Sequence, residues 1–182
     1  MSVLSTVIRV TLTSVVIGFL SACITPTSQP MLIFPDTIIN KPMMSVKSAT
    51  VVDSRSNKTL AVINKVDTPP NPNLESQLTT WLNDSVTVNP RGRLDFTVEI
   101  LNYATYVMQG TMQFEAESVM EWQAKITGEN GFSWIKNYQT TIKQDGPLNM
   151  DKSEIEIHLN KMANTLLSRT LEDPEFNAAL SH

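Results

Sequence analysis

The sequence predicts an α+β domain with two layers, in which two main helices pack on one face of a mainly antiparallel sheet of about four to five strands. Apolar and polar residues alternate through most of residues 94–142, as expected for strands with one face in the core and one in water. Residues 74–82 and 155–171 instead repeat apolar side chains at helical spacing. The length of 182 residues fits roughly one domain.

The composition excludes several kinds of site. The chain has 14 basic and 18 acidic residues, a formal net charge of -4, whereas a nucleic-acid-binding domain normally carries a basic surface. No nucleic acid partner is therefore expected. The single cysteine excludes a disulfide within the chain and a zinc site built from several thiolates.

Residues 1–22 have the layout of a secretory signal peptide. Arg9 precedes an apolar stretch over residues 10–19, and small residues follow it. Two threonines and a serine interrupt this stretch, which is shorter than the roughly 20 apolar residues that a membrane-spanning helix needs. An uncleaved signal anchor remains the alternative.

The segment that ends this stretch resembles the lipobox of bacterial lipoproteins; it consists of Leu20, Ser21, Ala22 and Cys23. The resemblance implies that Cys23 becomes the new N-terminus and carries an S-diacylglycerol group and an N-palmitoyl chain. Two or more acyl chains give a stable membrane anchor, whereas one gives marginal binding. Ile24 stands where an Asp would resemble an inner-membrane retention signal, so we expect a lipid-anchored protein on the periplasmic face of the outer membrane.

Residues 23–44 predict a Pro-rich tether that leads to a single periplasmic domain at 45–182. Its four prolines favour extended backbone over helix. The apolar residues 31–34 are expected to dock on the domain and shorten the free part of the tether.

The first half of the domain is expected to contain two strands and a helix. Clusters of β-branched residues predict strands over 45–53 and 60–66. The helical repeat that follows begins at Leu74, with Asn73 as a possible N-cap. A turn over residues 89–92 ends this unit.

Three longer strands follow, with their apolar residues on even positions. Three-residue loops at 108–110 and 129–131 would keep those positions on one face of the sheet. This pairing makes Phe96, Trp122 and Tyr138 neighbours and sets Ile126 opposite Trp134. The alternative two-residue turn at 130–131 would set Trp122 opposite a glutamine.

Lys136 breaks the alternation of the third long strand. It either extends its side chain to the margin of the sheet or marks a bulge. After the strands, Asp151 and Glu154 resemble a capping box that opens the long second helix. Asp173, followed by Pro174, caps a short last helix.

Candidate chemistry is sparse, and we expect no catalytic residues, metal or cofactor. Glu154 and His158 lie four residues apart on one helix, which is typical of a solvated pair and too few ligands for a metal. Acidic residues on the wet face of the sheet are expected to serve solubility rather than acid/base catalysis: Asp95, Glu99, Glu115, Glu117 and Glu121. Apolar residues expected on that same face would mark a protein-binding patch if they cluster: Leu101, Tyr103, Val119 and Ile135.

Several short motifs resemble the YajG family of bacterial lipoproteins. They are the sequence DSR at 53–55 with LAV at 60–62, the sequence KNY at 136–138 with Gly146, and the helix over 151–171. The resemblance implies an outer-membrane lipoprotein that faces the periplasm, without an established enzymatic activity. For Asp53 and Arg55 themselves we expect a surface turn with a local ion pair that contributes at most about 1 kcal/mol.

These observations lead to two hypotheses. The first is a non-enzymatic, lipid-anchored interaction or accessory module that faces the periplasm and serves envelope organisation or assembly through contacts with another protein. The second is a carrier or chaperone-like module that holds an apolar ligand between sheet and helices. A carrier needs a cavity of roughly 300 Å³ or more, lined by residues such as Met120, Trp122 and Met162, whereas an interaction module needs a closed core and an exposed apolar patch.

Overall fold

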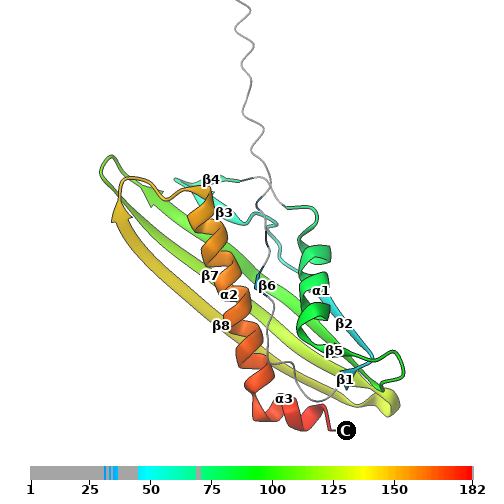
Figure 1. Cartoon of the computed structure of the whole chain (residues 1–182). Coiled ribbons are helices and arrows are strands. Elements are labelled where there is room, and N and C mark those ends of the chain that lie inside the picture. Colours follow the sequence, from blue (N-terminus) through cyan, green and yellow to red (C-terminus); the bar gives the residue numbers. More distant parts are fainter. Residues whose placement is uncertain (1–30, 32, 34, 37–44, 69–70, 182) are drawn as a thin grey trace, which may run out of the picture.

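The computed structural model describes residues 31, 33, 35–36, 45–68 and 71–181 (Figure 1). The elements in chain order are β1 (Ser45–Val46), β2 (Ser48–Asp53), β3 (Ala61–Ile63), β4 (Val66–Asp67), α1 (Leu74–Ser85), β5 (Thr87–Val88), β6 (Leu94–Gln109), β7 (Gln113–Gly128), the 3-10 turn η1 (Glu129–Gly131), β8 (Ser133–Pro147), α2 (Lys152–Glu172) and α3 (Pro174–Ala179). The expectation of an α+β domain is confirmed.

The main sheet is larger than expected and is mixed. It has six strands in the order β4-β3-β6-β7-β8, with β2 also paired to β6. The strands β6, β7 and β8 form an antiparallel meander, but β2 and β3 run parallel to β6. The prediction of four to five mainly antiparallel strands missed this, because short β-branched runs do not reveal which distant strand they pair with. A separate parallel pair joins β1 to β5.

Two short strands expected as single units are each interrupted. The segment 45–53 breaks at Lys47, whose N–H bonds the carbonyl of Leu94. The segment 60–66 turns at Asn64 and Lys65, both with positive φ, so that β4 folds back on β3. Positive φ is several-fold enriched at Asn and lets the chain reverse within two residues.

A β-bulge at Leu101 changes the pairing within β6. Ile100 lies opposite Trp122, but Asn102 lies opposite Glu121. Phe96 faces Ile126, and its predicted pairing with Trp122 is wrong, mainly because the turn between β6 and β7 lies further along the chain than predicted. The loop predicted at 108–110 is also displaced, because β6 continues to Gln109 and β7 starts at Gln113.

The turn between β7 and β8 agrees with the prediction. It is the three-residue turn Glu129–Gly131, with Gly131 at φ 79°. Trp122 therefore lies opposite Tyr138, and Ile126 opposite Trp134. The two-residue alternative is wrong.

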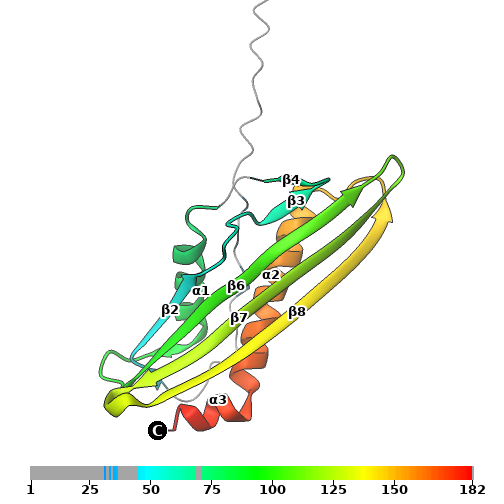
Figure 2. The same cartoon turned by 180° about the vertical axis from the view of Figure 1, so that it is seen from behind.

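The two main helices cover one face of the sheet, as expected (Figure 1). The capping box of α2 is present, since the side chain of Asp151 accepts from the N–H of Glu154 and Glu154 reciprocates. Asp173 caps α3 as predicted, but the side chain of Asn73 makes no capping bond to α1. None of the described helices lies on the opposite face of the sheet (Figure 2).

The described part of the N-terminal segment packs into the core. Met31 and Ile33 are buried, which confirms docking for these two residues of the apolar cluster. The amide of Asn71 donates to the carbonyl of Met31 at 3.0 Å, and the indole of Trp81 donates to the carbonyl of Asp36 at 3.1 Å. The core thus includes Met31 and Ile33, which precede the domain boundary predicted at residue 45.

Candidate functional site

The predicted lipid-attachment site lies outside the described residues. Cys23 and the rest of the lipobox, Leu20, Ser21 and Ala22, remain predictions from the sequence. Among the helices of the described region, none combines the length and apolar character required to cross a bilayer.

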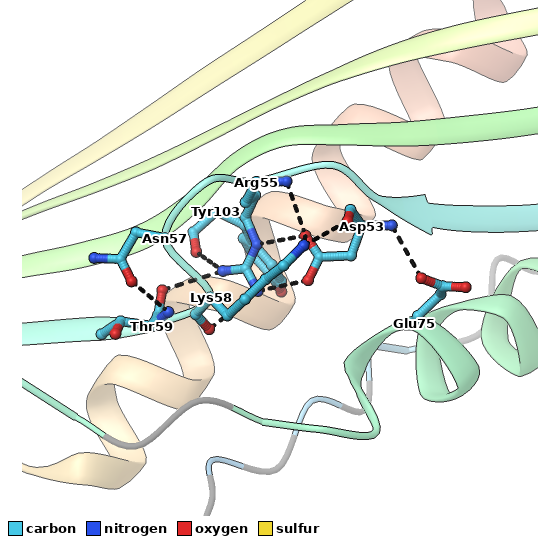
Figure 3. Close-up of polar contacts among 7 residues, drawn as sticks. All are labelled: Asp53, Arg55, Asn57, Lys58, Thr59, Glu75 and Tyr103. Carbon is cyan, nitrogen blue, oxygen red and sulfur yellow. Dashed lines mark hydrogen bonds and ion pairs between the residues drawn. The ribbon is translucent and has the colours of Figure 1, made fainter.

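Asp53 and Arg55 form a buried ion pair rather than the expected surface turn (Figure 3). The side chain of Arg55 is only 3% exposed and that of Asp53 10%. The guanidinium meets the carboxylate with two parallel bonds, from Nε to Oδ1 and from Nη2 to Oδ2, both at 2.9 Å. Burial alone would raise the pKa of Asp53, but the hydrogen bond and charge of Arg55 outweigh it and lower the pKa.

The other donors of Arg55 close the loop between β2 and β3. Nη1 donates to the carbonyls of Thr59 and Tyr103, and Nη2 donates to the carbonyl of Lys58. All five N–H groups are thereby used within the chain, so this Arg offers no donor to a ligand. The sequence DSR at 53–55, which resembles the YajG family, therefore holds the end of β2 against β6.

A second buried polar cluster joins the sheet to α2. Thr105 and Ser118 share a hydrogen bond of 2.8 Å, and the Ser118 hydroxyl lies 3.2 Å from Nδ1 of His158. Nε2 of His158 lies 2.5 Å from Oε1 of Gln144. Burial lowers the pKa of His158, and the charge of Lys161 adds to this effect.

This Ser-His pair does not form an accessible nucleophile. Ser118 is 0% exposed, so a substrate does not reach its hydroxyl in this structure. The sequence signal for the cluster was a serine within the apolar row of β7, between Ala116 and Met120. The cluster was not predicted, because one serine in an apolar row does not reveal a partner on a distant helix.

Glu154 and His158 do not act as a pair. The carboxylate of Glu154 accepts the N–H of Asp151, while His158 turns into the sheet. Within the described residues, no group of three His, Cys, Asp or Glu side chains could hold a metal ion.

The acidic face of the sheet is only partly neutralised. Lys143 pairs with Glu117 at 3.2 Å, and Asp95 accepts a hydrogen bond from Ser48. Glu115 and Asp145, however, lie directly opposite each other on β7 and β8. Neither has a cation partner in the described part of the chain, and like charges in this position repel.

Lys136 lies at the margin of the sheet without a bulge. Its ammonium is 2.8 Å from Asp173 and 3.0 Å from Glu175, which joins β8 to the start of α3. The phenol of Tyr138 donates to Asp173 at 2.7 Å. Burial would raise the pKa of Asp173, but the bonds from Lys136 and Tyr138 lower it to about 2.

A groove of about 780 Å³ lies beside the β6–β7 hairpin, where β6 and β8 end and β7 begins. Three apolar side chains on its wall are exposed: Tyr106 (47%), Met108 (55%) and Met112 (80%). Glu115, Lys143 and Asp145 line it as well. The groove opens on the face of the sheet that the described helices leave uncovered (Figure 2).

The sequence predicted a different set of exposed apolar residues. Leu101 and Ile135 are exposed as expected, but Tyr103 is fully buried. The bulge at Leu101 causes this error, since it turns Tyr103 inward and Tyr106 and Met108 outward. Buried residues stand on even positions before the bulge and mainly on odd positions after it. In a sequence, such a shift of the alternation by one residue is the signal that could reveal a bulge.

The cavity expected of a carrier does not form around the residues proposed for it. Met120, Trp122 and Met162 are all buried in the core and line none of the hollows described. The Tyr103 hydroxyl and the Trp122 indole N–H are buried without a hydrogen-bond partner in the described region. Neither residue lines those hollows.

Comparison with known proteins identifies one family. A family model described as "Uncharacterized lipoprotein" matches residues 40–181. Two crystal structures are similar: protein XCC0632 from Xanthomonas campestris, of family DUF330, at 12% identity and a TM-score of 0.47, and a neuraminyllactose-binding hemagglutinin homolog from Helicobacter pylori, at 10% identity and a TM-score of 0.43. Each match covers 82% of this chain and 98% of the other. The comparison with curated proteins gave no match.

Proposed function

Because the chain belongs to this family of uncharacterized lipoproteins, as its resemblance to the YajG family implied, we propose that it is a lipid-anchored interaction module of the bacterial envelope. In this proposal Cys23 carries the lipid, the outer membrane holds the anchor, and the domain faces the periplasm. The domain acts by binding another envelope protein and not by catalysis. The lipobox sequence and the family match support the anchor.

The groove beside the β6–β7 hairpin is the observation that carries the binding role. Tyr106, Met108 and Met112 keep about half or more of their surface exposed, although the core is otherwise closed. Exposed apolar side chains gathered at a concave site mark protein contacts more often than scattered ones do. Tyr and Met are also enriched in protein interfaces.

The charges of the groove indicate the chemistry of the partner. Glu115 and Asp145 repel each other across the strands, and Lys143 is already paired with Glu117. A basic side chain placed between the two free carboxylates would remove that repulsion. We therefore assign the groove to an envelope protein segment that presents an apolar side chain next to a Lys or Arg.

Site-specific photo-crosslinking in living cells tests the proposal. A benzoylphenylalanine residue at position 106 of the full-length protein is expected to give an adduct that mass spectrometry identifies as a second protein. The same probe at Arg91, which is exposed in the turn before β6 at the opposite end of the sheet, serves as the control. Equal labelling at both positions, or no labelling at position 106, would contradict the assignment of the groove as a binding site for another protein.

Charge reversal adds a matched pair of variants. Glu115→Lys is expected to weaken the adduct at position 106, because it repels a basic partner. Glu129→Lys makes the same charge change in the exposed turn between β7 and β8 and should leave the adduct unchanged. An adduct that survives Glu115→Lys would contradict the assignment of a basic partner.

The anchor has a test of its own. Cys23→Ser is expected to abolish palmitate labelling and release the protein from the membrane fraction. Retention of both would contradict the lipoprotein assignment. Proteolysis of intact cells should spare the domain, and its removal would contradict the periplasmic face.

A further inference from the structure

Among the described strands, β8 lies at one edge of the main sheet and pairs only with β7. It is the last strand in the order β4-β3-β6-β7-β8 and is 15 residues long. At the start of the ladder, the N–H of Gly128 bonds the carbonyl of Phe132, so even-numbered residues of β8 bond β7. The N–H and C=O groups of the odd-numbered residues therefore point away from the sheet.

One contact confirms this orientation. Nη1 of Arg169 donates to the carbonyl of Gln139 at 3.1 Å, from outside the β7–β8 ladder. The outward backbone groups of Ile135, Asn137, Thr141 and Lys143 have no such partner in the part of the chain that the structure describes. An unpaired row of this kind is a template for another strand.

The usual protections of an edge strand are weak here. Proteins often guard such edges with lysines or inward-pointing charges. The two lysines of β8 are both neutralised within the chain, Lys136 by Asp173 and Glu175, and Lys143 by Glu117. The strand has no bulge, and its one proline is the last residue.

The helix layer leaves room beside this edge. A hollow of about 500 Å³ is lined by Lys136, Tyr138, Arg169 and Glu172 at the end of α2. Trp134, Tyr138 and Ile142 face this layer and stay only partly buried. Side chains of an added strand would cover them.

We propose that β8 pairs in antiparallel fashion with β8 of a second copy of this chain, about a two-fold axis at Thr140. This register overlaps the whole of Ser133–Pro147, because residues 133 and 147 lie equally far from residue 140. The outward-pointing odd residues then bond one another, Asn137 with Lys143 of the second copy and Gln139 with Thr141. Arg169 releases the Gln139 carbonyl when the strands pair.

The side chains are compatible with this register. On the helix side Tyr138 meets Ile142 of the second copy, and Trp134 meets the glycine at 146, which leaves space for the ring. On the outer face Lys143 meets Asn137, and Asp145 meets Ile135. No like charges face each other, whereas an axis at 136, 143 or 145 would set two identical charges together.

A single engineered cysteine tests the register in the full-length protein. Thr140 would face its own counterpart in a non-hydrogen-bonded pair, with Cα atoms roughly 4.5 Å apart, which is within disulfide range. Thr140→Cys is therefore expected to give a dimer, removed by reductant, after mild oxidation with copper phenanthroline in membranes. Ser133→Cys should not, since it would lie about 48 Å from its counterpart. The wild-type protein, oxidised in the same way, shows how much crosslinked dimer Cys23 alone would give.

A second variant blocks the edge without removing a bond of the single copy. Thr141→Pro removes one outward N–H that has no partner within the chain. In detergent micelles, light scattering should give twice the protein mass for the wild type and the single mass for Thr141→Pro. An unchanged thermal midpoint of the CD signal would show that the variant is folded.

The outcomes separate this inference from the proposed function. A monomeric wild type, equal crosslinking at 140 and 133, or a Thr140→Cys adduct with a different protein would each overturn the pairing of two copies. The groove shares residues 143–147 of β8 with this edge, but position 106 lies on β6, two strands away from it. An adduct of position 106 with a different protein supports the groove whether or not two copies pair, and a Thr140→Cys dimer supports the pairing whether or not that adduct forms.

Discussion

Two outer strands of the same sheet, β2 and β8, differ in how their free edges are treated. At β2, side chains of α1 bond the outward backbone groups: Thr79 accepts the N–H of Val51, Glu75 accepts that of Asp53, and Asn83 donates to the carbonyl of Ala49. At β8, the described bonds to the outward groups come only from Arg169.

The difference assigns separate roles to the two sides of the molecule. Backbone groups of an edge strand recruit other strands unless they are bonded or covered. The β2 side, with the buried Asp53–Arg55 pair at its end, is closed and serves stability. The β8 side and the neighbouring groove are open, and we expect binding there.

Loss of Arg55 should have the largest effect on the closed side. Arg55→Ala leaves the Asp53 carboxylate without its buried partner and three carbonyls without a donor. Removal of one member of a buried pair costs about 3–5 kcal/mol, which urea unfolding would measure. Arg91→Ala, in an exposed turn, is the control. A loss below about 1 kcal/mol would mean that the pair behaves like a surface ion pair.

Opening the β2 edge should have an intermediate effect. Thr79→Val keeps the shape of the side chain but leaves the N–H of Val51 without an acceptor. An unpaired, partly buried donor costs about 1–3 kcal/mol, and the Val51 amide should exchange faster with solvent. Thr80→Val removes an exposed hydroxyl of the same helix and should change stability by less than about 0.5 kcal/mol. Equal effects of the two variants would contradict the role of α1 at this edge.

The contact of β8 with α3 predicts a pH dependence. The pKa of Asp173 is about 2 in the folded chain, below its ordinary value of 3.8, so the folded state gains stability above pH 4. That contribution should be lost as the pH falls from about 4 to 2. In Lys136→Met, an NMR titration should find the Asp173 pKa raised towards 3.8. Lys125→Met, on the outer face, should leave it unchanged.

The outer face should tolerate change at its exposed ion pair. Lys143→Gln breaks the contact with Glu117, in which both side chains are about half exposed or more. Exposed pairs of this kind contribute about 0.2–1 kcal/mol, so urea unfolding should detect a loss in the lower part of that range. A loss above about 1 kcal/mol would mean that the open side also serves the fold.

The meander was predictable because its signals are local. Alternation over β7 and β8 and one glycine turn were enough to find the pairing of Trp122 with Tyr138. The parallel strands β2 and β3 were not, because their partner is chosen by contacts with α1 and with the core that β6 builds. The bulge at Leu101 was also missed, since a one-residue shift in the alternation is its sign in the sequence and no Gly or Pro marks it.

The candidate sites divide in the same way. The lipobox is a contiguous motif and is therefore read from the sequence alone. The burial of Arg55 depends on the Tyr103 carbonyl, 48 residues away, whereas charged residues are ordinarily exposed. Tyr106 and Met108 were missed because their exposure follows from the bulge.

Amide hydrogen exchange tests the contrast between the two edges most directly. At low concentration the full-length protein in detergent should protect the amides of Val51 and Asp53, while those of Ile135, Asn137 and Thr141 exchange rapidly. The even-numbered amides of β8, bonded to β7, serve as an internal control. Raising the concentration should slow the odd-numbered amides alone, as the second copy binds. Odd-numbered amides that are already protected in the monomer, or that stay fast at every concentration, would contradict the account.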